Sequence, residues 1–196
     1  MSLVLDFFVK LTEENGIWWM IGQGFGIVAI ILGFISYQLR TKRQLLYMQT
    51  VVAFVFCIHY LLIGAYSATA MNFVNIIRNF AYDYRTNKNI RGKLIPIIFV
   101  VIQAIMCALT WDAWYSVFVL LGICINTYCM SNSNAQFVRK SILLTSPLVM
   151  TYDLFARSVG GTIYEAVALT SSAIGLARNA RAKKEGNQEP EEIKEL

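Results

Sequence analysis

The feature that most constrains the fold is an uncharged, mostly apolar stretch at residues 17–39, which reads IWWMIGQGFGIVAIILGFISYQL. A helix crosses the hydrocarbon core of a bilayer with about 20 apolar residues, so this stretch is long enough to do so. Asp6 and Lys10 precede it without a basic leader or a small-residue cleavage site, so we expect no cleaved signal peptide. The stretch therefore predicts a membrane-spanning helix.

Six further apolar segments follow, near residues 44–63, 65–84, 94–110, 113–130, 140–156 and 160–178. The whole chain is 57% apolar and 15% charged, whereas about 25% of the residues in a soluble domain are charged. This composition excludes a disordered chain, a collagen and a disulfide-stapled secreted scaffold. We predict an all-α membrane protein with seven transmembrane helices. The third and sixth segments each carry a charge, and the alternative is that these two are interfacial or re-entrant.

Lysine and arginine are concentrated in loops that a seven-span chain places on one side of the membrane. Fourteen of the seventeen basic residues fall there, in the connections 40–43 and 85–93, at the start of the sixth segment and in the tail. Basic loops mark the cytoplasmic side, so we predict an outer N-terminus and a cytoplasmic C-terminus. The net charge of +5 then reflects topology and contact with anionic lipid. We expect the lipid bilayer as a partner and no nucleic acid.

The seven segments divide naturally into three, one and three. Residues 59–85 and 152–178 align without a gap at an offset of 93, each with a helix end, a tight outer turn and a helix that closes on arginine. Two parallel three-helix bundles joined by a linker helix are an architecture of SWEET-type transporters. The predicted divisions are an outer segment 1–16, a first bundle 17–84, an inner loop and linker helix 85–112, a second bundle 113–178 and a polar cytoplasmic tail 179–196.

A polar stripe runs along the third segment. Its members share one arc of about 120° on a helix, and they are Asn72, Asn75, Arg78, Asn79 and Tyr82. Such a stripe faces other helices or a wet cavity rather than lipid. The functional interpretation is that it lines the path of a small polar solute. The alternative is that the asparagines are polar contacts that hold helices together.

The offset of 93 places Glu165 on the matching face of the seventh segment. Glu165 therefore joins Asn72, Asn75 and Arg78 in the predicted solute path. A pair between Arg78 and Glu165 would neutralise both charges, although their depths differ by about 10–12 Å at 1.5 Å per residue. Asp83 is a competing partner for Arg78.

His59 and Asp153 lie at similar depths in the second and sixth segments. Together they could relay protons in a coupled transporter, and both are candidate solute-site residues. The alternative is that His59 bonds a neighbouring helix. Pro147 lies inside the sixth segment, where it predicts a gating hinge or a static kink. Gly160 and Gly161, before the seventh helix, complete the candidate gating positions.

We predict no metal site, no cofactor and no enzymatic activity. The chain has one histidine and four cysteines, and the cysteines form no CxxC pattern. The glycine spacing at residues 22–26 is not a nucleotide-binding loop, because no strand precedes it. Signatures of serine hydrolases and kinases are absent.

The sequence resembles the YgjV family of bacterial inner-membrane proteins. The resemblance is carried by HYLLIGAY at residues 59–66, NIIRN at 75–79 and GGTIYE at 160–165, and it extends from GQGFGI at 22–27 to the basic end of the last segment. It implies a location in the bacterial plasma membrane and supplies no substrate. The positions that match the family pattern are His59, Asn75, Arg78, Gly160, Gly161 and Glu165. The likeness to SWEET, PQ-loop and PnuC-type transporters is one of topology alone, because the proline-glutamine dipeptide is missing here.

Two functions fit these observations. The first is a SWEET-like transporter or facilitator of a small polar solute, with a site between the two bundles. The second is a membrane scaffold or sensor that binds a partner subunit or lipid. A polar cavity between the bundles would favour transport, whereas a bundle packed solid around Arg78 would favour the scaffold.

Overall fold

The computed structural model describes residues 16–36, 42–88, 90, 92–132 and 135–184, and all regular structure in this part of the chain is α-helical. The seven helices are α2 (Ile17–Ser36), α3 (Lys42–Leu62), α4 (Tyr66–Asn87), α5 (Leu94–Leu109), α6 (Ser116–Met130), α7 (Ala135–Phe155) and α8 (Val159–Lys184). The prediction of seven helices without strands is confirmed for the described residues. Helix α7 begins five residues before the expected start and α8 ends six residues beyond the expected end.

Helix α8 therefore occupies the first residues of the predicted tail 179–196. The rest of that tail, and all but the last residue of the predicted outer segment 1–16, lie outside the described residues. By length and composition, α2 is the one described helix that could cross a membrane, with a mean hydropathy of 1.8. Shorter apolar helical stretches occur at Leu46–Leu62, Leu94–Leu109 and Ser116–Met130.

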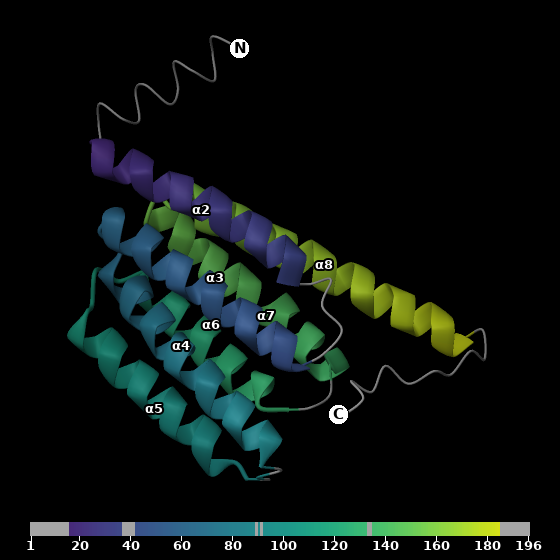
Figure 1. Ribbon diagram of the computed structural model, residues 1–196. Helices are drawn as coiled ribbons and strands as arrows, with labels where there is room; N and C mark the ends of the chain where they lie inside the picture. The colour runs from purple at the N-terminus through teal and green to yellow at the C-terminus, as the bar shows by residue number, and fades with distance from the viewer. Residues whose placement is uncertain (1–15, 37–41, 89, 91, 133–134, 185–196) are drawn as a thin grey trace.

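Neighbouring helices in the sequence pack side by side in space (Figure 1). Helix α3 lies between α2 and α4, and α7 lies between α6 and α8. Helix α5 contacts α4 and α6 at the edge of the assembly. Two further contacts, of α2 with α8 and of α4 with α6, close the arrangement. The first and last helices of the described chain therefore run side by side, as Figure 1 shows in purple and yellow.

Three short connections gather at one end of the assembly, and we call this end the turn end. They are residues 63–65 between α3 and α4, 110–115 between α5 and α6, and 156–158 between α7 and α8. Side-chain contacts between them, described below, hold this end together. The basic residues Arg43, Arg85 and Lys88 lie at the opposite end, next to the ends of α3 and α4.

Two apolar clusters fill the interior. The first lies toward the turn end and contains Ala29, Val52, Phe56, Tyr60, Ala65, Ala68, Met71, Cys107, Val119, Ile123 and Tyr152. The second lies toward the opposite end and contains Leu46, Val74, Tyr82, Phe99 and Met130. Large apolar side chains also cover the outer surface, for example Ile31, Phe34, Phe73, Phe80 and Leu109. Many large apolar side chains exposed in this way are typical of a protein that contacts lipid or another apolar phase.

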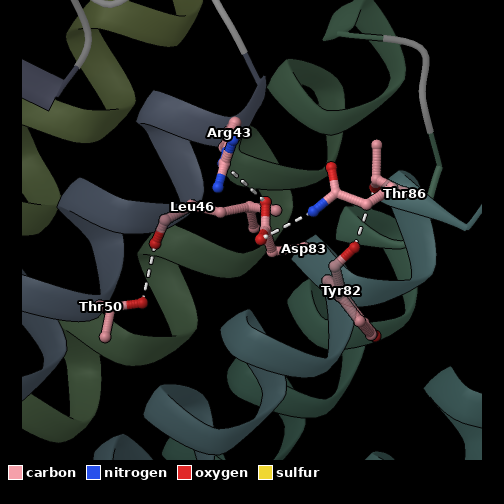
Figure 2. Close-up of polar contacts among 7 residues, drawn as sticks. Arg43, Leu46, Thr50, Tyr82, Asp83 and Thr86 are labelled. Carbon is pink, nitrogen blue, oxygen red and sulfur yellow. Dashed lines mark hydrogen bonds and ion pairs between the residues drawn. The ribbon is translucent and has the colours of Figure 1, made fainter.

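Polar contacts join α3 and α4 at the end opposite the turns (Figure 2). The Nε atom of Arg43 lies 3.8 Å from Oδ1 of Asp83, and Asn87 donates a hydrogen bond of 3.1 Å to Oδ2 of the same carboxylate. Arg43 is 79% exposed, so this ion pair contributes little to stability. Asp83 is thus engaged with Arg43 and Asn87, not with Arg78.

Candidate functional site

Two turns at the turn end have matching backbone hydrogen bonds. In the α3–α4 turn, the amide of Ala65 donates to the carbonyl of Tyr60 at 2.9 Å. In the α7–α8 turn, the amide of Ser158 donates to the carbonyl of Asp153 at 2.8 Å. Tyr60 and Asp153 are separated by 93 residues, and so are Ala65 and Ser158. The two turns are thus built alike at the offset found in the sequence.

The match extends to backbone conformation and to the following helix turn. Gly64 has a φ of +79° and Arg157, 93 positions later, has a φ of +53°. The hydroxyl of Thr69 donates to the Ala65 carbonyl at 3.0 Å, and Thr162 makes the same bond to Ser158 at 2.8 Å. Arg157 is unusual because residues other than glycine seldom adopt a positive φ.

Tyr60 and Asp153 meet where the two turns face each other. The Tyr60 hydroxyl donates a hydrogen bond of 2.7 Å to Oδ1 of Asp153, and both groups are buried. Asp153 is 0% exposed, and its Oδ2 has no hydrogen-bond partner among the described residues. Gly161 packs against this carboxyl group, because a Cβ at position 161 would lie 2.6 Å from the Asp153 carboxyl carbon. The backbone of α8 thus reaches Asp153 only because residue 161 is glycine.

The His59 ring joins three helices. Its Nδ1 lies 2.7 Å from the carbonyl oxygen of Gly22 in α2, and its Nε2 lies 2.7 Å from the hydroxyl of Ser158 at the start of α8. A carbonyl only accepts, so Nδ1 carries the proton. In the neutral ring Nε2 then accepts from Ser158, while the Ser158 oxygen accepts from the amide of Gly161 at 3.0 Å. The hydrogen bonds of His59 thus go to neighbouring helices, and its nearest route to Asp153 runs through Ser158.

Tyr152 lies 93 positions after His59 and contacts the start of α4. Its hydroxyl donates to Oδ2 of Asp112 at 2.9 Å. The same carboxylate accepts from the backbone amides of Tyr66 at 3.1 Å and Ser67 at 2.9 Å. Helix α4 has no side-chain cap of its own, so Asp112 from the α5–α6 connection satisfies its free amides.

The start of α8 is tied to α2. Gln23 accepts from the amide of Gly160 at 3.1 Å and donates to the carbonyl of Arg157 at 3.0 Å. A Cβ at Gly160 would lie 2.5 Å from the Cα of Gly26. The two helices therefore touch through their backbones. Gly160 and Gly161, the candidate gating glycines, both lie in the first turn of α8 at such close contacts.

Glu165 is on α8, one turn further from the turn end. It lies close enough to Asp153 for the two charges to repel, and Ser146 of α7 is within hydrogen-bonding reach of its carboxyl group. The structure thus brings His59, Asp153 and Glu165 into one region near the turn end.

The polar stripe of α4 lies elsewhere, against α5 and α6. Asn72 donates to the backbone of its own helix, at the Ala68 carbonyl. Asn75 accepts a 2.9 Å bond from Gln103 of α5, and Gln103 is fully buried. These two asparagines therefore serve helix structure and helix contact.

Arg78 is 3% exposed and binds across the contact between α4 and α6. Its Nη1 donates to the Thr127 hydroxyl at 2.7 Å, and its Nη2 donates to Oδ1 of Asn79 at 2.9 Å. Tyr82 adds its ring below the guanidinium, 5.8 Å from ring centre to Cζ, and its hydroxyl donates to the Thr127 carbonyl at 2.8 Å. Helix α4 packs on α3, α5 and α6, so Arg78 is held by α6 while Glu165 lies on α8.

Pro147 lies inside α7, which continues without a break from Ala135 to Phe155. Its own carbonyl accepts a 2.8 Å bond from the hydroxyl of Thr151. This bond does not replace the one that Pro147 cannot donate, because the carbonyl that loses its partner belongs to residue 143, four positions earlier.

Four polar side chains lie at or near the boundary between the two apolar clusters along their helices, and we call them the polar layer. Gln49 of α3, Asn126 of α6 and Thr145 of α7 are at positions between residues of the first and the second cluster, and Asn79 of α4 is between Val74 and Tyr82 of the second. Three of these carry a buried polar atom without a hydrogen-bond partner in the described residues, namely Gln49 Oε1, Asn79 Nδ2 and Asn126 Oδ1. Unmet polar groups of this kind are rare in protein interiors and call for a ligand or water.

Sequence reasoning missed four residues of this region: Tyr60, Asp112, Ser158 and Gln23. The signal for Tyr60 was present, because the offset of 93 pairs it with Asp153. Asp112 caps a helix that is 45 positions away in the sequence, and no local pattern announces such a contact. Among the described residues no group of three His, Cys, Asp or Glu side chains could hold a metal ion.

Comparison with known proteins identifies the family. The profile of the family described as "Bacterial inner membrane protein", Imp-YgjV, matches residues 20–183. The chain belongs to the YgjV family. Inner membrane protein YgjV of Escherichia coli (strain K12) is 23% identical over 169 residues, which cover 86% of this chain and 89% of the relative. No solved structure matches. The YgjV family resemblance and the inner-membrane location expected from the sequence are both confirmed.

Proposed function

We propose that this inner-membrane protein is a transporter or facilitator of a small polar solute. In this proposal all seven helices cross the membrane, with the turn end outside and the basic end in the cytoplasm. The apolar outer surface supports the spans, and the short connections of the turn end contrast with the basic connections opposite. Helix α2, with 20 residues, is about 30 Å long and matches the hydrocarbon thickness.

The proposal treats the chain as two related halves, α2–α4 and α6–α8, with α5 as the linker. The matched hydrogen bonds of the two turns support this division, since they recur at one offset. So do the contacts between the halves. A two-fold axis that exchanges the halves would turn the contact of α2 with α8 into the contact of α6 with α4, and both contacts are present. The Gln23–Gly160 bond and the 3.2 Å contact between Ser67 and Ser116 occupy equivalent positions.

The single observation that carries the proposal is the bond between Tyr60 and Asp153. Two equivalent residues can touch only if they lie next to the axis that relates the halves. Here the contact closes the space between α3 and α7 at the turn end. Transporters with parallel repeats work by rocking one half against the other around a site near mid-membrane. The closed turn end corresponds to an arrangement shut toward the outside.

The polar layer supplies the proposed solute site below this closure. Its unpaired groups are two carbonyl oxygens and one amide nitrogen, so it suits an uncharged solute rich in hydroxyl or amide groups. Asn72, Asn75 and Arg78, which were expected to line the path, are engaged with neighbouring helices. We assign them to positioning the wall of the site, next to Asn79.

A reversible crosslink between the halves tests the transport proposal. We expect the Ser67→Cys/Ser116→Cys variant, in a background whose four native cysteines are alanine, to form a disulfide on oxidation. The two hydroxyl oxygens lie 3.2 Å apart, and serine and cysteine have the same shape. In proteoliposomes, uptake of a solute found by screening should stop on oxidation and return on reduction. Ser67→Cys alone is the control. Equal uptake by the crosslinked protein would contradict the rocking of the halves.

The packing of Arg78 favours a second candidate function. Its guanidinium is buried against Asn79, Thr127, Tyr82 and Met130, as expected of a scaffold or sensor that binds a partner subunit or lipid. In that case no solute should accumulate, and Arg78→Ala should reduce stability without changing any flux across the membrane. Loss of uptake in a stable Arg78→Ala protein would instead return Arg78 to the solute path.

A further inference from the structure

We propose that Asp153 is a proton-binding site and that its carboxyl group carries a proton in the arrangement described here. We further infer that release of this proton accompanies separation of α3 from α7 at the turn end. The second statement rests on the proposed transport function, whereas the first stands without it.

The first argument is burial without a counter-charge. Asp153 is 0% exposed, and the ion pair recorded in the described residues joins Arg43 to Asp83 at the opposite end. The groups that face Asp153 are Tyr60 from α3, Glu165 from α8 and Tyr152 of its own helix. His59 is adjacent through Ser158. None of these supplies a positive charge when His59 is the neutral tautomer that its bonds indicate. A buried carboxylate without a cation takes up a proton instead of remaining charged.

The second argument is the count of hydrogen-bond donors. A carboxylate has about four acceptor positions and needs several donors when buried. Asp153 receives one, from Tyr60, and Oδ2 has none. The Ser158 hydroxyl also lies within hydrogen-bonding reach of this carboxyl group, but it has a single proton, which the neutral His59 ring accepts at Nε2. The arrangement therefore fits a carboxylic acid, whose Oδ1 accepts from Tyr60 while Oδ2 carries the proton.

The third argument is the second carboxyl group in the same interior. Glu165 lies close enough to Asp153 to disfavour two negative charges, and such neighbours titrate as a coupled pair. Glu165 is only partly buried and has Ser146 as a neighbour. Asp153 is the more enclosed of the two, so we assign the proton to Asp153.

The link to conformation follows from where the bond lies. Helices α3 and α7 are not in direct backbone contact, and the Tyr60–Asp153 bond crosses between them. An ionised Asp153 needs water, which reaches it only if the two helices separate at the turn end. A proton that binds one arrangement better than the other shifts the balance between them. Binding at Asp153 would thus favour the closed turn end.

Infrared spectroscopy of the purified protein in lipid nanodiscs tests the first statement directly. A protonated, dehydrated carboxylic acid has a carbonyl stretching band that a carboxylate lacks. We expect this band at neutral pH, lost in Asp153→Asn and kept in Glu165→Gln and in the matched surface control Asp83→Asn. Asparagine has the shape of the neutral acid, so the fold should be retained. Absence of the band at neutral pH, or its loss in Glu165→Gln alone, would overturn the assignment.

Two measurements keep the test valid if a variant folds poorly. Aspartate labelled with ¹³C at the side-chain carboxyl should shift the band in the unaltered sequence, and a band that does not shift contradicts the assignment. The folded protein should also bind one more proton than the unfolded chain, so its melting temperature should fall as the pH rises from 5 toward 8. In Asp153→Asn, the melting temperature should fall less over the same pH range.

Transport is measured separately, so the two proposals fail separately. Acidification of the outer side should slow solute exchange by the wild type, because proton binding at Asp153 favours the closed turn end, and Asp153→Asn should lose this dependence on external pH. Exchange by Asp153→Asn with the same pH dependence as the wild type would refute the link to conformation and leave the infrared band as it is. An infrared band with no transported solute would instead remove the transport function and keep the proton site.

Discussion

The contact of α2 with α8 and the contact of α4 with α6 join the same two groups of helices in different ways. In the first, Gly26 and Gly160 bring the backbones together, and Gly33 lies under the ring of Tyr164. In the second, hydroxyl and guanidinium groups bridge the helices, as in the 2.7 Å bond from Arg78 to Thr127. Lipid removes the hydrophobic drive between helices, so close packing and hydrogen bonds take its place. The contact of α2 with α8 combines close backbone packing with the hydrogen bonds of Gln23, whereas the contact of α4 with α6 relies on side-chain hydrogen bonds.

The largest effect is expected from a side chain placed in the glycine contact. Gly160→Leu should destabilise the protein by about 3 kcal/mol, because its Cβ would meet the backbone of Gly26, which cannot rotate away. Thermal unfolding in detergent, followed by circular dichroism, measures the loss. Gly24→Leu is the matched control on α2, since nothing lies within 4 Å of a Cβ there. Equal melting temperatures for both variants would mean that the helices do not touch.

Removal of one hydrogen-bond acceptor from the contact of α4 with α6 should reduce the free energy of unfolding by less than Gly160→Leu does. Thr127→Val keeps the side-chain shape and deprives the buried Arg78 of one bond, at a cost of about 2 kcal/mol. Thr170→Val is the control, because that threonine is exposed and bonds only its own helix. Chemical denaturation of both variants gives the difference. A cost for Thr127→Val no greater than that of the control would show that the hydroxyl is dispensable to Arg78.

Helices α8 and α4 differ in which residue caps their N-terminal amides. Helix α8 uses its own Ser158, whereas α4 relies on Asp112 from another connection. Asp112→Ala should cost about 1.5 kcal/mol, since two amides of α4 and the Tyr152 hydroxyl lose their acceptor. Hydrogen exchange of the first turn of α4 should accelerate, while the first turn of α8 stays protected. Uniform acceleration in both turns would argue against a local cap.

The smallest effect concerns the positive-φ residues of the two matched turns, Gly64 and Arg157. Gly64→Ala should cost about 1 kcal/mol because alanine disfavours this backbone conformation. Arg157→Gly should relieve the backbone strain at the equivalent position, because glycine adopts a positive φ at little cost. Melting temperatures of the two variants, measured together, test the equivalence of the turns. Backbone strain at Gly64→Ala without any relief of strain at Arg157→Gly would contradict the equivalence of the two turns.

The sequence predicted the helices well because apolar length and the positions of turns are local properties. The offset of 93 likewise paired Tyr60 with Asp153, although only the structure showed that they touch. The partner of the α4 stripe could not be predicted. Periodicity indicates which side chains share a face, but it does not indicate whether that face meets α6 or α8. Arg78 was weighed against Glu165 and Asp83, and its hydrogen bonds go to Thr127 and Asn79 instead.

The distant capping of α4 was beyond sequence reasoning for a related reason. Asp112 follows Trp111 in the connection between α5 and α6, and no local pattern there indicates a capping role. Its role depends on the loop meeting the start of another helix, 45 residues earlier. His59 was nearer to prediction, since a bond to a neighbouring helix was one of its two interpretations. The bonds to Gly22 and Ser158 are of that kind.

The side-by-side packing of α2 and α8 also has a consequence for the order in which the protein is made. Helix α2 leaves the ribosome early, but the α8 partners of Gly26 and Gly33 are missing until Gly160 and Tyr164 have been synthesised. During that interval this face of α2 must remain against lipid or against an insertion factor. A chain that stops after α7 would leave it open permanently. We expect such truncated chains to be recognised as incomplete and degraded by membrane proteases.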